Sequence, residues 1–256
     1  MLLDPGGRAY HLDIAPGEVG RYVLMPGDPG RVEPIAERLG GARKLAERRE
    51  YLTWVGTLDG AEVAVTSTGI GCPSAAIAVE ELAGAGADTF IRVGQAGGMQ
   101  PDTLSGDLVV AAAAIRDEGT TRQYVPEAFP AVADLDVTAA FRDGLREAGL
   151  RHHVGVVQSK DSFYGQRARE RMPVAGELEA RWRAWIAAGA LCSEMEAAAI
   201  FVVASVLRKR AGGIMLVAGN QEIDPEGRHR GDAKLETLID GAIAGLRTLI
   251  QRDTSN

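Results

Sequence analysis

Three arginines beside glycine-rich turns are the residues of this sequence best suited to chemistry. Arg31 ends a Met-Pro-Gly-Asp-Pro-Gly-Arg segment, Arg49 lies in Glu-Arg-Arg-Glu-Tyr, and Arg92 precedes Val-Gly-Gln-Ala-Gly-Gly. A guanidinium is planar, always charged, and able to donate two parallel hydrogen bonds to a phosphate. Glycine lets backbone N–H groups approach the same oxygens because it carries no Cβ. The pattern favours a small oxyanion as ligand, although any one of these arginines alone could form an ordinary surface salt bridge.

Composition and charge favour a single α/β domain over residues 1–256, in the cytoplasm. No linker rich in Pro, Ser or Gly divides the chain. The net charge of −7 argues against a nucleic-acid partner but leaves room for a local basic pocket. We expect no membrane partner, because no apolar run could span a bilayer and the N-terminus does not resemble a signal peptide. Cys72 and Cys192 are expected to be reduced structural thiols, although a disulfide stays open.

Short β-type runs alternate with longer helical patterns along the chain. The expected strands are Arg21–Leu24, Tyr51–Leu58, Glu62–Ser67, Thr89–Val93, Leu108–Ala113, His153–Gln158 and Gly213–Val217. The expected helices are Pro29–Leu39, Ser74–Ala85, Val137–Ala148, Glu177–Ala188, Glu196–Arg210 and Ala233–Gln251. Asp59-Gly60 is a strong hairpin-turn signal between two of these strands. This alternation predicts a mostly parallel or mixed sheet covered by helices.

The segments that could do chemistry follow predicted strands or precede a predicted helix. They are Gly27-Asp28, Thr68–Gly71, Gly94-Gln95, Asp161–Phe163 and Glu194–Glu196. Ligands of such sheets gather at the carboxyl ends of the strands. We therefore expect separate loops to converge on one rim of the sheet and to form one site there.

Seven segments carry a recognisable series of motifs along nearly the whole chain. They are Pro26–Val32, Ser67–Ser74, Ala78–Leu82, Phe90–Gly94, Phe129–Asp134, Asp161–Gln166 and Glu194–Ala198. In this order they resemble the nucleoside phosphorylases, and among them the uridine phosphorylases. The resemblance implies a three-layer α/β/α sandwich with a central mixed sheet, a homodimer as the active unit and a homohexamer of three dimers. It also implies inorganic phosphate as co-substrate and no cofactor.

At matching positions the resemblance assigns a phosphate site. Gly27, Arg31 and Arg92 would hold the phosphate, and Arg49 would reach in from the neighbouring subunit. Gln95 stands where the family usually has threonine or serine; it can still donate to phosphate, but its longer side chain takes up space near C1′ or the phosphate. Arg31 and Arg92, with Glu196, would be the catalytic residues.

The same resemblance assigns the nucleoside site. His11 would cross the subunit interface toward the ribose 5′-hydroxyl, while Met195 and Glu196 would hold the ribose. Phe163 would pack against the base, and the carboxamide of Gln166 would read the N3–H and a carbonyl of uracil. Some relatives hold a monovalent cation such as K⁺ at the dimer interface, at positions matching Glu50, Ile70 and Ser74.

Several of these residues also have simpler interpretations. Taken alone, His11 would be a solvated histidine near the N-terminus, and Phe163 could belong to the core. Glu194 and Glu196 could be first-turn residues favoured by the helix dipole.

The implied chemistry is cleavage of a nucleoside C1′–N bond with oxocarbenium character on the ribose. Phosphate on the opposite face would be both nucleophile and stabilising anion, so electrostatic preorganisation and positioning would supply most of the rate. Inversion at C1′ would give the free base and α-ribose 1-phosphate. Purine-specific relatives place an aspartate after the late strand, whereas here the first acid after Met215–Asn220 is Glu222. The sequence therefore favours a pyrimidine nucleoside.

Two arginines expected in a uridine site are missing. The base-site arginine is replaced by Ala168, which Arg167 and Arg169 flank, and the late-strand arginine is replaced within Ala218–Asn220. Losing both members of the pair suggests an altered or relaxed base pocket, for a uridine modified on the base or at the 5′ position. Three alternatives stay open: a hydrolytic nucleosidase on the same fold, a non-catalytic nucleoside-binding protein, and a purine phosphorylase.

Overall fold

A computed structural model describes residues 2–224 and 233–255 and is built around one ten-stranded sheet. The strands are β1 (Tyr22–Pro26), β2 (Gly40–Arg48), β3 (Tyr51–Leu58), β4 (Ala61–Thr66), β5 (Thr89–Gly98), β6 (Leu108–Asp117), β7 (Ala131–Val132), β8 (His152–Lys160), β9 (Cys192–Glu194) and β10 (Arg210–Asn220). The α-helices are α1 (Val32–Ala36), α2 (Cys72–Ala85), α3 (Leu135–Glu147), α4 (Phe163–Arg167), α5 (Ala175–Ala187), α6 (Ala197–Val206) and α7 (Leu235–Ser255). Short 3₁₀ turns occupy Pro29–Arg31, Thr121–Gln123 and Arg169–Arg171.

The sheet is mixed, and part of it closes on itself. Its order is β10-β6-β8-β9-β5-β1-β4-β3-β2. Because β5 also pairs with β10, a closed ring is formed by the five strands β10, β6, β8, β9 and β5. β5 is parallel to β1 and β10 along its first part and antiparallel to β9 at Gly97 and Gly98. This long strand therefore joins the ring to the rest of the sheet, and its carboxyl end lies where several strands meet.

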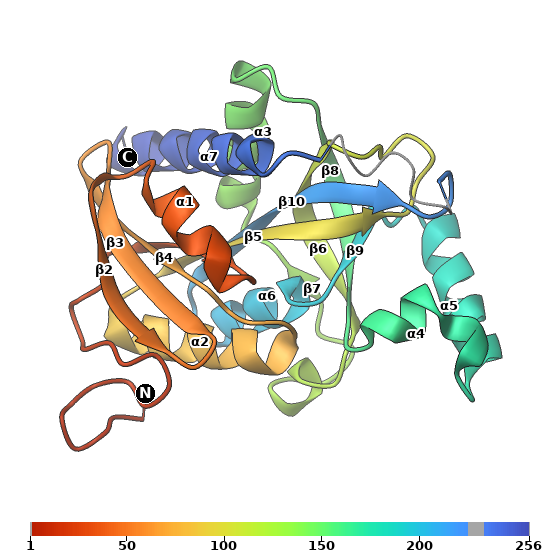
Figure 1. Ribbon diagram of the computed structural model, residues 1–256, viewed down its shortest axis with the longest axis horizontal. Helices are drawn as coiled ribbons and strands as arrows, with labels where there is room; N and C mark the ends of the chain where they lie inside the picture. The colour runs from red at the N-terminus through yellow and green to blue at the C-terminus, as the bar shows by residue number, and fades with distance from the viewer. Residues whose placement is uncertain (1, 225–232, 256) are drawn as a thin grey trace.

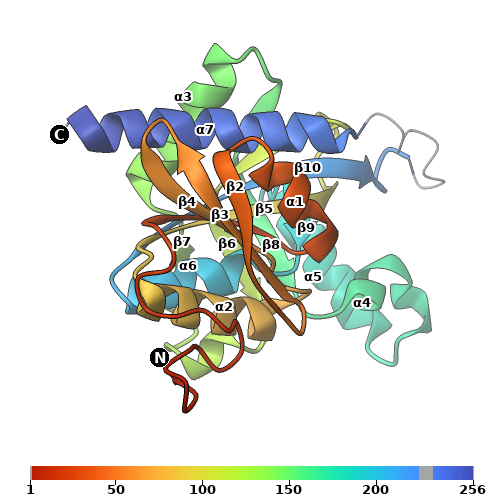
Figure 2. The same ribbon diagram turned by 60° about the vertical axis from the view of Figure 1, so that its left-hand side comes forward.

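Side chains along the central strands alternate between two cores, as the pleat of a strand requires. Val23 and Met25 of β1 pack in the core that contains α2 and α6. Tyr22 and Leu24 point the other way, into the core that contains α1, α3 and α7. Figures 1 and 2 show α3 and α7 on one face of the sheet and α2 and α6 on the other. The α/β/α layering predicted for the chain is confirmed.

Each expected strand and helix has a counterpart, and Asp59-Gly60 joins β3 to β4 as predicted. No sequence pattern predicts β2. Within the described residues this strand pairs with β3 alone, and most of its side chains are exposed, so its sequence is charged rather than alternating.

Several predicted boundaries differ from the structure, and three of them change how an element is described. The strand expected at Thr89–Val93 continues to Gly98, because β10 and then β9 supply backbone partners, so Gly94-Gln95 lies inside β5 rather than after it. The helix expected at Glu196–Arg210 is α6, which ends at Val206, and Arg210 already belongs to β10. The helix expected at Pro29–Leu39 is a 3₁₀ turn followed by the short α1.

Among the residues described, none of the helices has both the length and the apolar character that crossing a membrane would need. No group of three or more His, Cys, Asp or Glu side chains in this part of the chain is placed to hold a metal ion. Cys72 and Cys192 are free and buried, so the open disulfide alternative is excluded.

The contact between α3 and α7 leaves no room at Gly245. A Cβ there would lie 2.4 Å from Cδ1 of the buried Phe141 ring. We expect Gly245→Val to lower the free energy of unfolding by about 1–3 kcal/mol, because the added atoms overpack a filled core.

Urea denaturation would measure this change, with Gly176→Val in α5 as the matched control, since a Cβ at Gly176 has no atom within 4 Å. The control should alter stability by no more than about 0.5 kcal/mol. Equal effects of the two substitutions would contradict the packing described for α3 and α7.

Candidate active site

A cavity of about 530 Å³ opens at the rim where β1, β8 and β9 end. Its volume suits a small molecule, since ligand pockets span roughly 300–1,000 Å³. Its lining includes most of the residues predicted from the sequence: Gly27, Arg31, Ile70, Arg92, Gln95, Phe163, Gln166, Met195 and Glu196. The other predicted residues, His11, Arg49, Glu50 and Ser74, do not line it.

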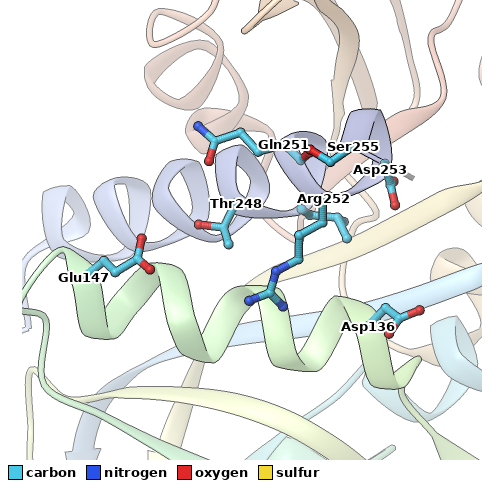
Figure 3. Close-up of a pocket in the computed structure, with 8 residues that line it drawn as sticks. Asp136, Glu147, Thr248, Gln251, Arg252, Asp253 and Ser255 are labelled. Carbon is cyan, nitrogen blue, oxygen red and sulfur yellow. The ribbon is translucent and has the colours of Figure 1, made fainter.

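A second cavity, of about 430 Å³, lies between α3 and α7 and contains none of the predicted residues. Figure 3 shows Arg252 of α7 reaching toward α3 across this space. Its guanidinium already donates to Asp143 at 2.6 Å. We therefore place the candidate active site in the first cavity.

Arg92 is buried beneath the cavity with only 4% of its surface exposed. Its Nη2 donates to Glu196 at 2.5 Å, and its Nε donates to Glu194 at 3.4 Å. Burial disfavours the charge on Arg92, but Glu196 and Glu194 outweigh burial and raise the pKa of the guanidinium. Arg92 is therefore a fixed positive charge at the floor of the site.

Arg31 approaches the same region from the 3₁₀ turn that follows β1. Its Nη2 donates to Oε1 of Gln95 at 2.8 Å, while its nearest carboxylate, Asp28, is 3.8 Å from Nε. Because the carboxamide oxygen accepts from Arg31, the amide group of Gln95 remains a donor. The substituted glutamine thus orients an arginine instead of merely filling space.

The two guanidinium groups repel each other. Burial lowers the pKa of Arg31, and the charge of Arg92 lowers it further, while Asp28 partly compensates. Gly27 lies against Arg92, since a Cβ there would be 3.4 Å from Nη1 of Arg92. An anion bound between Arg31 and Arg92 would relieve this repulsion.

The two glutamates before α6 have different surroundings. Glu194 accepts from the backbone N–H groups of Glu196 at 2.8 Å and Ala197 at 3.0 Å, so it satisfies the start of the helix. Glu196 instead accepts from the N–H of Gly71 at 2.7 Å and from Arg92. The helix-dipole interpretation therefore holds for Glu194, and Glu196 faces the cavity.

Another part of the cavity wall is formed by α4. Phe163 is 48% exposed and lines the cavity, which excludes the interpretation that it belongs to the core. Oε1 of Gln166 lies 3.0 Å from Oγ of Ser193, whose single hydrogen can also be donated to Oε1 of Gln158 at 2.5 Å. The amide nitrogen of Gln166 lies 3.9 Å from the position that a Cβ of Gly97 would occupy. An aromatic ring and a carboxamide therefore lie together, far along the chain from the arginine pair.

His11 and Arg49 are held away from the cavity of their own chain. Nδ1 of His11 lies 2.6 Å from Oε1 of Glu81, and this carboxylate also accepts from the backbone N–H groups of His11 and Leu12. The interpretation of His11 as a solvated side chain is therefore wrong. Arg49 is exposed in the turn between β2 and β3, with φ at 57°.

The residues predicted to hold a cation lie together around Gly69. A Cβ on Gly69 would be 2.8 Å from Cγ of Glu50 and 3.4 Å from Oγ of Ser74. Oγ of Ser74 lies 3.1 Å from the carbonyl oxygen of Gly71 and 3.4 Å from that of Ile70. The structure thus brings these three residues together; Ile70 lines the cavity, whereas Glu50 and Ser74 do not.

The sequence profile of the phosphorylase superfamily matches residues 21–244. The chain belongs to this superfamily. The uridine phosphorylase of Treponema pallidum is 48% identical over 96% of this chain and 95% of its own. The guanosine phosphorylase of Halorubrum lacusprofundi is 40% identical over 83% of this chain and 86% of its own.

Solved structures agree with this placement in the phosphorylase superfamily. The crystal structure of uridine phosphorylase from Vibrio fischeri superposes with a TM-score of 0.85 and is 32% identical. The match covers 97% of this chain and all of the other. The superfamily fold therefore extends over nearly the whole chain.

Sequence reasoning missed one charged residue in the site of this phosphorylase-superfamily protein. Lys160, the last residue of β8, lines the cavity and is only 7% exposed. The signal in the sequence was a single lysine at the end of an otherwise uncharged strand. A lysine that is buried in such a place usually has a charged or polar partner. Of the two arginines that flank Ala168, Arg167 lines the cavity, whereas Arg169 donates to Glu179 of α5 and to the carbonyl of Gln166.

We expect Arg92→Met to lower the free energy of unfolding by about 3–5 kcal/mol, because it leaves two buried carboxylates without their cation. Adding Glu196→Gln to this variant should restore part of the loss, because it removes one of those charges. Urea denaturation of the single and double variants would measure both effects.

Arg31→Met serves as the control, since the partner of Arg31 is the neutral Gln95. It should change stability by no more than about 1 kcal/mol. Strictly additive effects of Arg92→Met and Glu196→Gln would contradict the ion cluster as the cause.

Proposed function

We propose that this protein cleaves uridine, or a close analogue, with inorganic phosphate to give the free pyrimidine and α-ribose 1-phosphate. The observation that carries the proposal is the pair of guanidinium groups, Arg31 and Arg92, which both line the cavity and repel each other. The carboxamide of Gln166 lines the same cavity. The names of the relatives support the same activity.

Phosphate would bind between Arg31 and Arg92, against the backbone at Gly27. Each guanidinium can donate two parallel hydrogen bonds to its oxygens. Gln95 would hold Arg31 in place through its carbonyl and donate to phosphate through its amide group. The bound dianion would then offset the repulsion between the positive charges of Arg31 and Arg92.

Ribose would lie above the phosphate, with its hydroxyls donating to the carboxylate of Glu196. Met195 would pack against the sugar. During the reaction a phosphate oxygen forms a bond to C1′ while the C1′–N1 bond breaks, and the electron pair stays on N1. The positive charge that develops on the ribose lies between phosphate and Glu196, which both stabilise it. Attack from the face opposite the base gives the α-anomer.

The base would stack on Phe163 and present its N3–H and a carbonyl to Gln166. A purine would need an acid near the late strand, and the nearest candidate is already engaged. Glu222 accepts from Nε1 of Trp182 at 2.8 Å and does not line the cavity. This arrangement favours a pyrimidine over the purine named for the Halorubrum relative.

Two residues of the site would come from a second copy of the chain. Arg49 and His11 lie outside the cavity of their own chain, as a residue that completes a partner's site would. We therefore extend the proposal to a homodimer as the active unit and a homohexamer of three dimers. Glu50, Ile70 and Ser74 would bind K⁺ at the same interface.

We expect cleavage of uridine to depend strictly on inorganic phosphate, because phosphate is the nucleophile. Ultraviolet absorbance would follow base release with and without phosphate, and phosphorus NMR would detect α-ribose 1-phosphate. Activity undiminished in phosphate-free buffer would instead establish a hydrolase, and binding without base release would establish a non-catalytic binding protein. Inosine in the same assay tests the purine alternative.

We expect Arg49→Ala and Arg31→Ala each to be nearly inactive, and their mixture to regain activity. In a mixed dimer one site carries both substitutions and the other carries neither, so an equal mixture should reach about a quarter of wild-type activity. Co-expression would form the mixed dimers, and steady-state rates would measure the recovery. The same variants mixed without subunit exchange are the control. No recovery in mixed dimers would refute the shared site.

A further inference from the structure

The base end of the cavity lacks the positive charge that the two missing arginines would have supplied. Ala168 does not line the cavity, and Ala218, which does, is uncharged. Asn220 does not replace the missing charge, because it is neutral and its amide group donates to the carbonyls of Gln100 at 2.8 Å and Thr103 at 3.0 Å. Positive charge at this end must therefore come from other positions.

Lys160 is one such position. It extends from the end of β8, and its Nζ donates to Oγ of Ser193 at 2.7 Å and to the carbonyl of Glu194 at 3.4 Å. Oγ of Ser193 also lies 3.0 Å from Oε1 of Gln166. One hydroxyl therefore lies within hydrogen-bond distance of both the ammonium group and the carboxamide proposed to read the base. Within the described residues these contacts occupy two of the three N–H donors of Lys160, which leaves one for a ligand.

Arg167 is the other position. Its guanidinium stacks over the ring of Phe163, with Cζ 5.8 Å from the ring centroid. Its Nη2 and Nε2 of Gln166 each lie 3.9 Å from the position that a Cβ of Gly97 would occupy. Arg167 and Gln166 therefore approach the same stretch of β5, and both line the cavity.

Both groups can be cationic when substrate binds at neutral pH. Burial lowers the pKa of Lys160 to about 8, with Arg167 lowering it too, while Glu194, Glu196 and Cys192 oppose the shift. A pKa of about 8 leaves most of Lys160 protonated at pH 7. The guanidinium of Arg167 is charged at any physiological pH.

The proposed reaction needs positive charge at this end. When the C1′–N1 bond breaks, N1 keeps the electron pair, and the negative charge spreads over N1, O2 and O4 of the departing pyrimidine. The new C1′–O bond to phosphate completes the exchange, and the pyrimidine anion takes a proton from solvent after release. A cation placed near O2 or O4 stabilises the transition state more than the neutral substrate.

We infer that Lys160 and Arg167 stabilise the departing pyrimidine anion and so replace the two arginines that this chain lacks. The inference rests on the proposed phosphorolysis and assigns two further residues to it. Lys160 acts from the floor of the base pocket, beside Ser193, and Arg167 acts from α4. If Lys160 only balanced the charges of Glu194 and Glu196, its substitution would lower kcat/KM by the same factor for substrates with good and with poor leaving groups.

The test compares uridine with 5-fluorouridine. Fluorine withdraws electrons, so 5-fluorouracil leaves as a weaker base and needs less stabilisation. Lys160→Met should lower kcat/KM about 100-fold for uridine and only about 10-fold for 5-fluorouridine, which is the scale of losing one transition-state donor. Lys160→Arg should retain most of the activity. Arg167→Ala should show the same preference for the better leaving group, and it provides an independent answer if Lys160→Met does not fold.

Arg171→Ala is the matched control, since this exposed arginine stacks on Tyr164 and does not line the cavity. It should leave both rates unchanged. Equal losses of Lys160→Met and Arg167→Ala on the two nucleosides, or no loss, would overturn the assignment of Lys160 and Arg167. A wild-type protein that cleaves neither nucleoside in phosphate would instead overturn the proposed function.

Discussion

A buried cluster of three charged side chains at the rim of the sheet constrains the positions of the elements that form the rest of the site. Arg92 is 4% exposed, and Glu194 and Glu196 are each 3% exposed. A charge this deeply buried is tolerated only with partners, so each of the three must be held by the others and by backbone groups. Glu194 accepts hydrogen bonds from backbone N–H groups at the start of α6, and Glu196 accepts one from the backbone N–H of Gly71. The cluster thereby ties together β5, β9, α6 and the loop before α2.

The glycines around Arg92 serve this cluster in a way that sequence reasoning did not anticipate. They were interpreted as positions where backbone N–H groups approach a phosphate. In the structure a Cβ on Gly94 would lie 2.8 Å from Cζ of Arg92, so glycine makes room for the side chain beside its own strand. A Cβ on Gly98 would lie 2.7 Å from the carbonyl of Thr103. Glycine therefore lets β5 continue into contact with its neighbours, which is why the strand does not end at Val93.

The sequence predicted the fold better than the site, for physical reasons. Strand and helix periodicity depends on burial along one element, and β3, β4 and α7 follow it closely. The cavity depends on which side chains from distant elements meet. The motifs predicted Arg31, Arg92 and Glu196, but not that Gln95 would orient Arg31. Lys160 escaped prediction because a single lysine at the end of a strand is usually exposed.

The cationic side chains that line the cavity form two groups. Arg92 lies beside Gly27, is paired to Glu196 and repels Arg31, whereas Lys160 and Arg167 lie close to Gln166. The chain as a whole has a net charge of −7, so this local concentration of cations is not a consequence of composition. Phosphorolysis of a nucleoside would place negative charge on phosphate and on the departing base, with positive charge on the sugar between them. Two groups of cations and one carboxylate suit that distribution, whereas hydrolysis by neutral water would need only the cations near the base.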